Sequence, residues 1–362
     1  MPNTTVMFAG GGTGGHLVPG IAVAEELHRR HSSAECVFVG SERPLERTIL
    51  TNAGFEQIAL PVQPPRVMLR RPLRSSVGLY NSVRRLRQLF RERRPSVVIG
   101  LGGFASSLSL WFATRHKIPT ILLEQNTVAG RATRLFAKRA STICTSFAET
   151  DFGGAKTNRV VVTGNPVRSK ITEIYSTNSD PTHRRTLLVL GGSQGARAVN
   201  ERVLSLLPAL EPELQDWKIV HQTGSHDEHH VRTKYMECNL AATVSAFFPD
   251  LSQFYSEAGL VISRAGATTL SELTCAGIPS ILVPYPSAKD DHQRKNARFF
   301  ADAGAAIVCE QDADSNRWCE SVRRLLCESA ERAKMRQAMS SLAKPHAARD
   351  VTDIVMKFLP DG

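Results

Sequence analysis

Two glycine-rich turns constrain the fold of this chain more than any other feature: Gly10-Gly11-Gly12-Thr13-Gly14-Gly15-His16 and Gly191-Gly192-Ser193-Gln194-Gly195-Ala196. Each turn follows an apolar run typical of a β-strand and leads into a helical pattern. Glycines let backbone N–H groups approach an anion closely, and the dipole of the following helix favours negative charge there. Two such units in one chain predict two similar domains, each with a phosphate-bearing ligand at its turn.

Short β-rich runs alternate with helical patterns along the whole chain, which predicts parallel sheets covered by helices on both faces. In the first half we expect strands at 6–10, 36–40, 56–60, 96–101, 120–124, 142–145 and 160–163, and helices at 19–31, 76–93, 105–116 and 129–139. In the second half we expect strands at 186–190, 218–222, 243–247, 260–263, 280–283 and 305–309, and helices at 196–207, 227–236, 251–258, 268–276, 293–303, 316–344 and 346–358. The predicted class is α/β, with two Rossmann-like, doubly wound parallel-sheet domains facing a central cleft.

The length of 362 residues suits two domains of ordinary size. A break at Thr163-Gly164-Asn165-Pro166, followed by a polar stretch, predicts domains at 1–164 and 165–345. We expect the last segment, 346–362, to form a helix that packs back on the N-terminal domain.

Composition narrows the cellular setting. No run approaches ~18 uninterrupted apolar residues, and the N-terminus lacks the pattern of a signal peptide, so we expect neither a membrane span nor a leader. The seven cysteines are scattered and form no C-x-x-C pair, which is typical of a reducing, cytoplasmic protein.

The net charge of +11 is concentrated in one segment: residues 66–94 hold ten arginines and a single acid, Glu92. Apolar residues lie between the arginines, and such a basic amphipathic segment favours contact with an anionic membrane surface. An ordinary solvated surface helix is the first alternative. Nucleic-acid binding is a weaker one, because the chain lacks a recognition motif or an aromatic stacking set.

The first turn also satisfies the dinucleotide pattern G-x-G-x-x-G, which is weak evidence by itself. A dinucleotide fold should place an acid at the end of the second strand, but that strand ends Val39-Gly40-Ser41, with Glu42 only beyond it. His16, at the mouth of the turn, is placed to act as a base or phosphate contact. The plain alternative is that His16 only caps the helix.

The segment Ser263–Glu272 predicts another strand-to-helix anion site, in which Thr268 and Thr269 can cap the helix. Glu272 could accept both hydroxyls of a ribose, but Thr269 and Glu272 also fit a capping box, and spacing alone favours the cap. Further on, Gln293 and Asn296 carry amides that suit sugar hydroxyls. Asp312-Ala313-Asp314 is most simply the start of a helix, and we expect no metal and no cofactor.

Several motifs together resemble the signature set of the MurG family, the bacterial peptidoglycan N-acetylglucosaminyltransferases with the two-domain GT-B fold. They run in chain order: Gly11-Gly12-Thr13-Gly14-Gly15-His16, Glu124-Gln125-Asn126, Gly164-Asn165-Pro166-Val167-Arg168, Gly191 to Ala196, Ser263 to Glu272, and His292-Gln293-Arg294-Lys295-Asn296-Ala297.

The resemblance implies an inverting transferase that moves N-acetylglucosamine from its UDP ester to the muramoyl 4-hydroxyl of undecaprenyl-pyrophosphoryl-MurNAc-pentapeptide (lipid I). It implies a C-terminal domain that binds the donor and an N-terminal domain that binds the acceptor and the membrane. The implied UDP-N-acetylglucosamine contacts are Thr13, Gly14, Gly15, Asn126, Arg168, Ser193, Phe248, Ala267, Thr268, Thr269, Leu270, Ser271, Glu272 and Gln293. The implied acceptor diphosphate contacts are Gly14, Gly15, Gly102, Gly103 and Phe104.

The same resemblance implies a peripheral protein on the cytoplasmic face of the inner membrane, with contacts to other cell-wall or division proteins. The expected membrane contacts are Met68, Leu69, Arg70, Arg71, Leu73, Arg74, Leu79 and Tyr80. The expected catalytic base is His16, with Glu124 as the competing carboxylate.

The chain departs from the family pattern at three points, one of which is the segment after Gly103, less rich in glycine and proline than usual. Leu123 stands where the family often has histidine, which removes one candidate catalytic group, and Phe248 begins an unusual sequence at the expected uracil contact. Two rival functions stay open at this point. One is a UDP-N-acetylglucosamine 2-epimerase or another GT-B transferase, and the other is a nicotinamide-dependent oxidoreductase.

Overall fold

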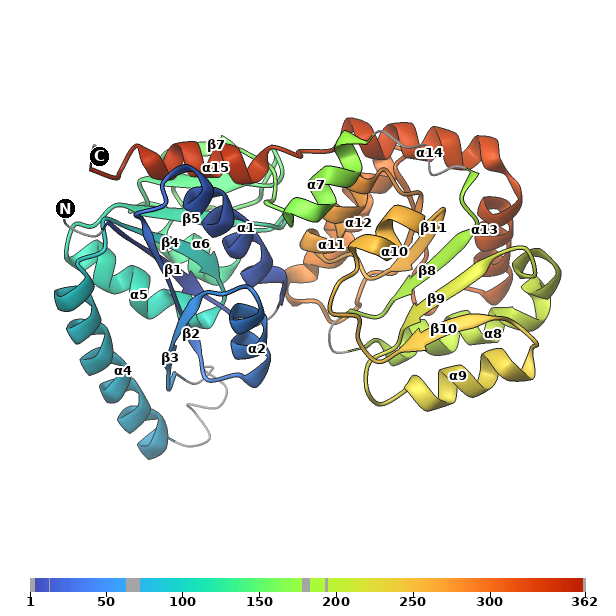
Figure 1. The fold of residues 1–362 in the computed structure, drawn as a ribbon, viewed down its shortest axis with the longest axis horizontal. Helices are drawn as coiled ribbons and strands as arrows, with labels where there is room; N and C mark the ends of the chain where they lie inside the picture. The colour runs from blue at the N-terminus through green and yellow to red at the C-terminus, as the bar shows by residue number, and fades with distance from the viewer. Residues whose placement is uncertain (1–3, 13, 63–71, 178–182, 193–194, 361–362) are drawn as a thin grey trace. The chain divides into compact units, whose positions relative to one another are not determined.

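The computed structural model describes residues 4–12, 14–62, 72–177, 183–192 and 195–360, with the backbone alone for residues 72–74. The chain divides into two compact units, Met1–Arg168 with His346–Gly362 and Ser169–Pro345 (Figure 1). Each unit is built on one sheet whose strands pair in parallel. The predicted α/β class is therefore confirmed.

The first unit holds a seven-stranded sheet in the order β3-β2-β1-β4-β5-β6-β7. Its strands are β1 Thr5–Gly10, β2 Glu35–Ser41, β3 Glu56–Leu60, β4 Val97–Gly102, β5 Thr120–Glu124, β6 Thr142–Thr145 and β7 Val160–Val162. Its helices are α1 Gly14–Arg30, α2 Pro44–Asn52, α4 Pro72–Arg93, α5 Phe104–Arg115, α6 Arg131–Phe136 and α15 Ala347–Met356. The order reverses at β1, so the first glycine turn lies at the switch point, where open α/β sheets bind ligands.

Helices cover both faces of this sheet. Along β1, Val6 and Phe8 pack with residues of α1, α2 and α15, while Met7 and Ala9 pack with residues of α4, α5 and α6. This alternation is the period of a strand buried on both sides. Helix α15 comes from the far end of the chain and lies against α1, where Asp353 pairs with Arg30 at 2.6 Å.

The second unit holds a six-stranded sheet in the order β10-β9-β8-β11-β12-β13. Its strands are β8 Thr186–Leu190, β9 Lys218–Gln222, β10 Ala242–Ser245, β11 Leu260–Ser263, β12 Ser280–Leu282 and β13 Ala306–Val308. Its helices are α7 Ser169–Ser176, α8 Arg197–Leu214, α9 Glu228–Glu237, α10 Ser252–Glu257, α11 Ala267–Ala276, the short η2 Lys289–Asp291, α12 His292–Asp302, α13 Ser315–Cys327 and α14 Ser329–Ser341. Here the order reverses at β8, and the second glycine turn follows that strand.

The helices differ from the expected ones at four places. Helices α2 and α7 were not anticipated, and the helix expected at 316–344 is two helices, because Glu328 takes an extended conformation between them. Helix α8 continues past its expected end through Pro208 and Pro212. Its leucines on both sides of Pro208 are buried in the core, and this packing outweighs the cost of proline inside a helix. None of the helices in the described part of the chain is long and apolar enough to cross a bilayer.

Candidate functional site

The first glycine turn is held by backbone-to-backbone contact with the turn that follows β4. A Cβ on Gly10 would lie 2.7 Å from the carbonyl oxygen of Gly102, and a Cβ on Gly103 would lie 2.7 Å from that of Gly11. Real Cβ atoms do not approach an oxygen so closely, so the glycines are required by this contact. The contact brings two of the predicted segments together at one sheet edge.

A buried carboxylate that the sequence reading missed occupies one side of this turn. Glu46, on α2, is 1% exposed; its Oε1 accepts the Gly12 N–H at 2.6 Å and its Oε2 accepts the Ser41 N–H at 2.9 Å. The carboxyl group of Glu46 thus joins the glycine turn to the end of β2. Pro44 at the first helical position was the available signal for α2, because proline is favoured there.

Glu46 also bears on the dinucleotide alternative. Ser41 ends β2, the place where such a fold needs an acid facing a ribose, but the carboxylate there bonds to the protein's own backbone. The start of α1 is less covered: Gly15 is exposed, and Gly14 and His16 are half-buried. Thr13 lies outside the described residues.

His16 is the third residue of α1, inside the helix and past its capping position. Its imidazole lies against the turn after β4: a Cβ on Gly102 would be 3.0 Å from His16 Cδ2 and 3.2 Å from Nε2. Phe104, the next expected acceptor contact, begins α5 and is partly exposed. His16, Gly102 and Gly103 therefore form one cluster at the carboxyl ends of β1 and β4.

Glu124, at the end of β5, is 4% exposed and its carboxylate is extensively hydrogen-bonded. Oε1 accepts the Asn126 backbone N–H at 3.2 Å and side-chain amide at 3.4 Å, while Oε2 accepts the Gly130 N–H at 2.8 Å. Burial is the larger influence and raises the pKa of this carboxyl, although these bonds and one from Thr133 act to lower it. Its contacts fix the segment 126–133, which starts α6.

Leu123, which stands where the family often has histidine, lies in the core. Leu123 lies in β5, is almost fully buried and packs with residues of α1 and α15. The side chain at this position is therefore directed into the apolar layer, and its replacement of histidine leaves the His16 cluster intact.

In the second unit, the glycine turn closes between Gly192 and Gly195, whose N–H donates to the Gly192 carbonyl at 3.1 Å. A Cβ on Gly195 would lie 2.6 Å from the carbonyl oxygen of Thr223, so this turn also rests on the backbone after the neighbouring strand. Helix α8 begins directly after the turn. Ser193, with Gln194, lies outside the described residues.

The start of α11 differs from the expected capping box. The helix is capped by Gly266 without a side-chain bond, so Thr268 and Thr269 are its second and third residues rather than caps. Glu272 is in the second turn of the helix, 3% exposed, and its Oε2 accepts the hydroxyl of the buried Tyr255 at 3.1 Å. The capping alternative for Glu272 was therefore wrong, because the helix starts earlier than the spacing suggested. Within the expected run, Ala267 and Leu270 are buried and Ser271 donates to the Ala267 carbonyl at 2.9 Å.

The loops around α11 are held by two polar residues. Arg264 donates to the Val283 and Pro284 carbonyls at 3.2 and 3.1 Å, and burial lowers its pKa. Asn296, expected to contact a sugar, is instead fully buried and donates to the Ala265 carbonyl at 3.3 Å.

The other expected donor contacts are spread over both units. Gln293 is the second residue of α12, and its Oε1 accepts the Tyr285 N–H at 3.0 Å. Phe248 follows β10, and the centroid of its ring lies 4.6 Å from that of Phe254. Arg168 belongs to the first unit. Burial raises the pKa of Glu25, and the charge of Arg168 offsets part of this rise. Asp314 caps α13, as expected from its position.

A polar network supports the second turn from inside the domain. Asn200, on α8, donates to the Thr223 carbonyl at 3.0 Å and to Asp227 at 2.8 Å, so its Oδ1 faces His221 Nε2 at 3.1 Å. His221 Nε2 must therefore carry the proton, and Nδ1 accepts from Tyr235 at 3.0 Å. Burial lowers the pKa of His221 to about 3.

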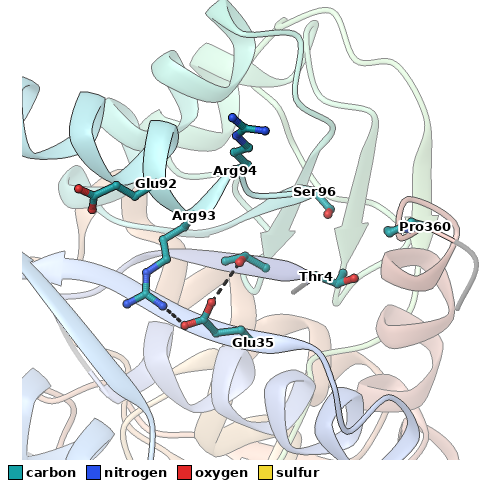
Figure 2. Close-up of a pocket in the computed structure, with 8 residues that line it drawn as sticks. Thr4, Glu35, Glu92, Arg93, Arg94, Ser96 and Pro360 are labelled. Atoms are coloured by element: carbon teal, nitrogen blue, oxygen red, sulfur yellow. Dashed lines mark hydrogen bonds and ion pairs between the residues drawn. The ribbon is translucent and has the colours of Figure 1, made fainter. Parts of the chain in front are cut away.

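A cavity of about 370 Å³ lies elsewhere, at the amino ends of the strands in the sheet of the first unit (Figure 2). Arg93 projects into it and pairs with Glu35, which also accepts the Thr5 hydroxyl at 3.1 Å. Because parallel sheets bind ligands at their carboxyl ends, this ion-paired cavity is separate from the candidate site.

The comparisons with known proteins all indicate one family. Residues 6–145 match the glycosyltransferase family 28 N-terminal domain, and residues 186–353 match its C-terminal domain. A UDP-N-acetylglucosamine–N-acetylmuramyl-(pentapeptide) pyrophosphoryl-undecaprenol N-acetylglucosamine transferase of Anaeromyxobacter dehalogenans is 39% identical over 98% of this chain and 93% of its own length.

Solved structures agree. The crystal structure of Acinetobacter baumannii MurG has a TM-score of 0.75 and 27% identity, covering 98% of this chain and 99% of its own. A UDP-GlcNAc 2-epimerase from Neisseria meningitidis has a TM-score of 0.68 but 13% identity, covering 98% and 99%, so that likeness shows the fold alone.

We expect Glu46→Gln to destabilise the first unit by about 1–3 kcal/mol. The new amide nitrogen would face the Ser41 N–H, and these two donors would both lack an acceptor. Urea unfolding measures the change. Glu42→Gln, an exposed neighbour, should stay within about 0.5 kcal/mol. Equal effects of the two substitutions would show that Glu46 does not hold the turn.

Burial of neutral His221 predicts a pH-dependent stability. An unfolded histidine takes up a proton near pH 6.5, but the folded one does so only near pH 3. The contribution of His221 to the free energy of unfolding is therefore fully present above about pH 6.5. As the pH decreases below that value, the free energy of unfolding drops by up to about 1.4 kcal/mol per pH unit. Urea midpoints between pH 4 and 7 measure this slope. His221→Gln should flatten it, whereas the exposed control His229→Gln should not; an unchanged slope in His221→Gln contradicts the assignment.

Proposed function

This chain belongs to glycosyltransferase family 28, and from that premise we propose that it is a MurG-type N-acetylglucosaminyltransferase. It transfers N-acetylglucosamine from UDP-N-acetylglucosamine to the muramoyl 4-hydroxyl of lipid I, giving lipid II for peptidoglycan synthesis. The observation that carries this proposal is the 39% identity to a transferase so named, along 98% of this chain.

The second unit is the proposed donor domain. The amino ends of α8, which begins just after the glycine turn, and of α11 would supply helix dipoles for the diphosphate and would stabilise the charge on departing UDP. Glu272, oriented by the Tyr255 hydroxyl, would accept from the ribose, and Gln293 would contact the sugar. Arg168 is a further proposed phosphate contact.

The first unit is the proposed acceptor domain. The amino end of α1 at Gly14 and Gly15 and the turn at Gly102 and Gly103 present helix N-termini at one sheet edge. Such ends favour a diphosphate, and Phe104 is exposed beside them. Asn126, held against Glu124, would contact the transferred sugar.

The proposed base is His16. The muramoyl 4-oxygen attacks the anomeric carbon, the bond from that carbon to the UDP oxygen breaks with inversion, and the imidazole takes the hydroxyl proton. Glu124 is the weaker candidate, since its carboxylate is buried and its bonds to Asn126 and Gly130 hold the local backbone. Glu124 then serves to position Asn126.

The proposed membrane contact is α4 with the segment before it. The helix turns Leu86, Leu89 and Phe90 into the core, leaving Val77, Leu79 and Tyr80 exposed at its first half and arginines along its second. Trp111, on the neighbouring α5, is 49% exposed and was not anticipated. Of the other expected contacts, Met68, Leu69, Arg70 and Arg71 lie outside the described residues, and the side chains of Leu73 and Arg74 are not described.

This surface would place the protein peripherally on anionic lipid at the cytoplasmic face, where its acceptor lies. Basic residues near a membrane contribute about 1 kcal/mol each, and exposed aromatic residues favour the interface.

The function is tested by incubating the full chain with labelled UDP-N-acetylglucosamine, with and without a lipid I analogue. The proposal expects label in the lipid fraction only when the acceptor is present. Acceptor-independent conversion of the UDP-sugar to its 2-epimer would contradict it.

In the same assay, His16→Ala should lower turnover by about 10²–10⁴-fold while the affinity for UDP changes little, because positioned proton transfer contributes about that much. His28→Ala, an exposed histidine on the same helix, is the matched control and should keep wild-type turnover. A wild-type rate in His16→Ala would remove His16 from the role of base.

Membrane contact is tested by co-sedimentation with vesicles of anionic and of zwitterionic lipid. We expect binding to the anionic vesicles that weakens with salt, and about a tenfold loss in a Leu79→Ser, Tyr80→Ser double variant, since exposed apolar area would be removed. Substituting Met236→Ser, exposed on α9 of the other unit, should leave binding unchanged. Equal losses in both variants would contradict the proposed surface.

A further inference from the structure

We propose that Gln222 is a positioning residue for the nucleotide, because its side-chain amide sets the spacing between the diphosphate segment and the uracil segment. The inference rests on the proposed function, in which UDP occupies the second unit. Neither the sequence motifs nor the expected contacts include this residue.

Gln222 is the last residue of β9, the strand that lies between β8 and β10, and it is 2% exposed. Its Nε2 donates to the carbonyl of Gly192, in the turn after β8, at 3.3 Å. Its Oε1 accepts the N–H of Phe248, in the loop after β10, at 3.0 Å. One buried amide therefore joins the loops that follow both neighbouring strands.

Both ends of this bridge act on the backbone at points that shape the loops. The Gly192 carbonyl is the one that also closes the glycine turn by accepting from Gly195 at 3.1 Å, and the Gly191 N–H donates to the Gln222 carbonyl at 3.1 Å. On the other side, the Phe248 ring is fixed by its contact with Phe254. A shift of the amide would move one segment relative to the other.

The bridge needs an amide. To reach both loops, the side chain must donate to the Gly192 carbonyl, which also accepts from Gly195, and accept from the Phe248 N–H; a glutamine side chain does both at a fixed separation. A carboxylate would satisfy Phe248 but face the Gly192 carbonyl without a proton, and a methionine would satisfy neither. Either change removes a hydrogen bond that ties one loop to the other, so the loops would move apart or rearrange.

Spacing matters because UDP carries its base and its diphosphate on one framework. Two linked fragments gain affinity over separate ones only when their two sites stand at the matching distance. A change in spacing should therefore weaken UDP far more than it weakens uridine or inorganic pyrophosphate, each of which needs only one of the sites. A merely structural role would weaken all three alike.

The test measures affinities of the full chain for UDP, uridine and inorganic pyrophosphate in wild type and Gln222→Met. We expect UDP to weaken about tenfold, as for the loss of one or two buried hydrogen bonds, with changes below about twofold for the two fragments. Gln215→Met, an exposed glutamine at the end of α8, is the control. Equal weakening of all three ligands, or no weakening of UDP, overturns the inference.

Gln222→Glu supplies an independent readout, and carries the test if Gln222→Met does not fold. A protonated carboxyl can donate to Gly192 and accept from Phe248, whereas a carboxylate cannot, and burial raises the pKa of such a group. The UDP affinity of Gln222→Glu, relative to wild type at the same pH, should recover as the pH falls. A ratio that stays constant with pH overturns the inference.

The two proposals fail differently. If the wild-type chain does not bind UDP, the proposed function is wrong and this inference falls with it. If the wild-type chain binds UDP and the Gln222 variants bind all three ligands as wild type does, only the positioning role is wrong.

Discussion

Backbone-to-backbone contact at the carboxyl ends of the switch strands is the constraint on which both units depend. The turn after β1 presses on the turn after β4 at Gly10 and Gly102, and the turn after β8 presses on the backbone after β9 at Gly195 and Thr223. A side chain at Gly10 or Gly195 would clash with that backbone, so packing fixes the turns before any ligand arrives. Helices α1 and α8 then begin at nearly the same topological place and direct their amino ends to the ligand side.

The two units differ in the side chain that braces each turn, which comes from helix α2 in the first unit and from the end of strand β9 in the second. In the first unit a carboxylate, Glu46, receives the Gly12 and Ser41 N–H groups; in the second a neutral amide, Gln222, donates to Gly192. A carboxylate beside Gly12 would repel a phosphate there, which is consistent with the proposed acceptor site at the start of α1. The Gln222 amide carries no charge, which suits a turn proposed to hold the diphosphate of a nucleotide.

Sequence reasoning predicted most of the fold, because strands buried on both faces and glycine turns leave strong local signals. It missed Glu46 and Gln222, since their roles arise from contacts between loops and give no periodic pattern. It also misplaced the start of α11. The cap is Gly266, but the sequence favoured Thr269, and with that cap Glu272 fits the pattern of a capping box. For Leu123 the departure from the family pattern suggested a lost catalytic group, but the side chain's direction into the core could be seen only in the structure.

The central claim is that the nucleotide diphosphate belongs to the turn of the second unit, and a crystal structure of the full chain with UDP tests it most directly. The account predicts the diphosphate beside Gly192 and Gly195, the base beside Phe248, and Glu46 still bonded to the Gly12 N–H. A diphosphate seated at Gly10–Gly12, with the Glu46 carboxylate displaced, would contradict it.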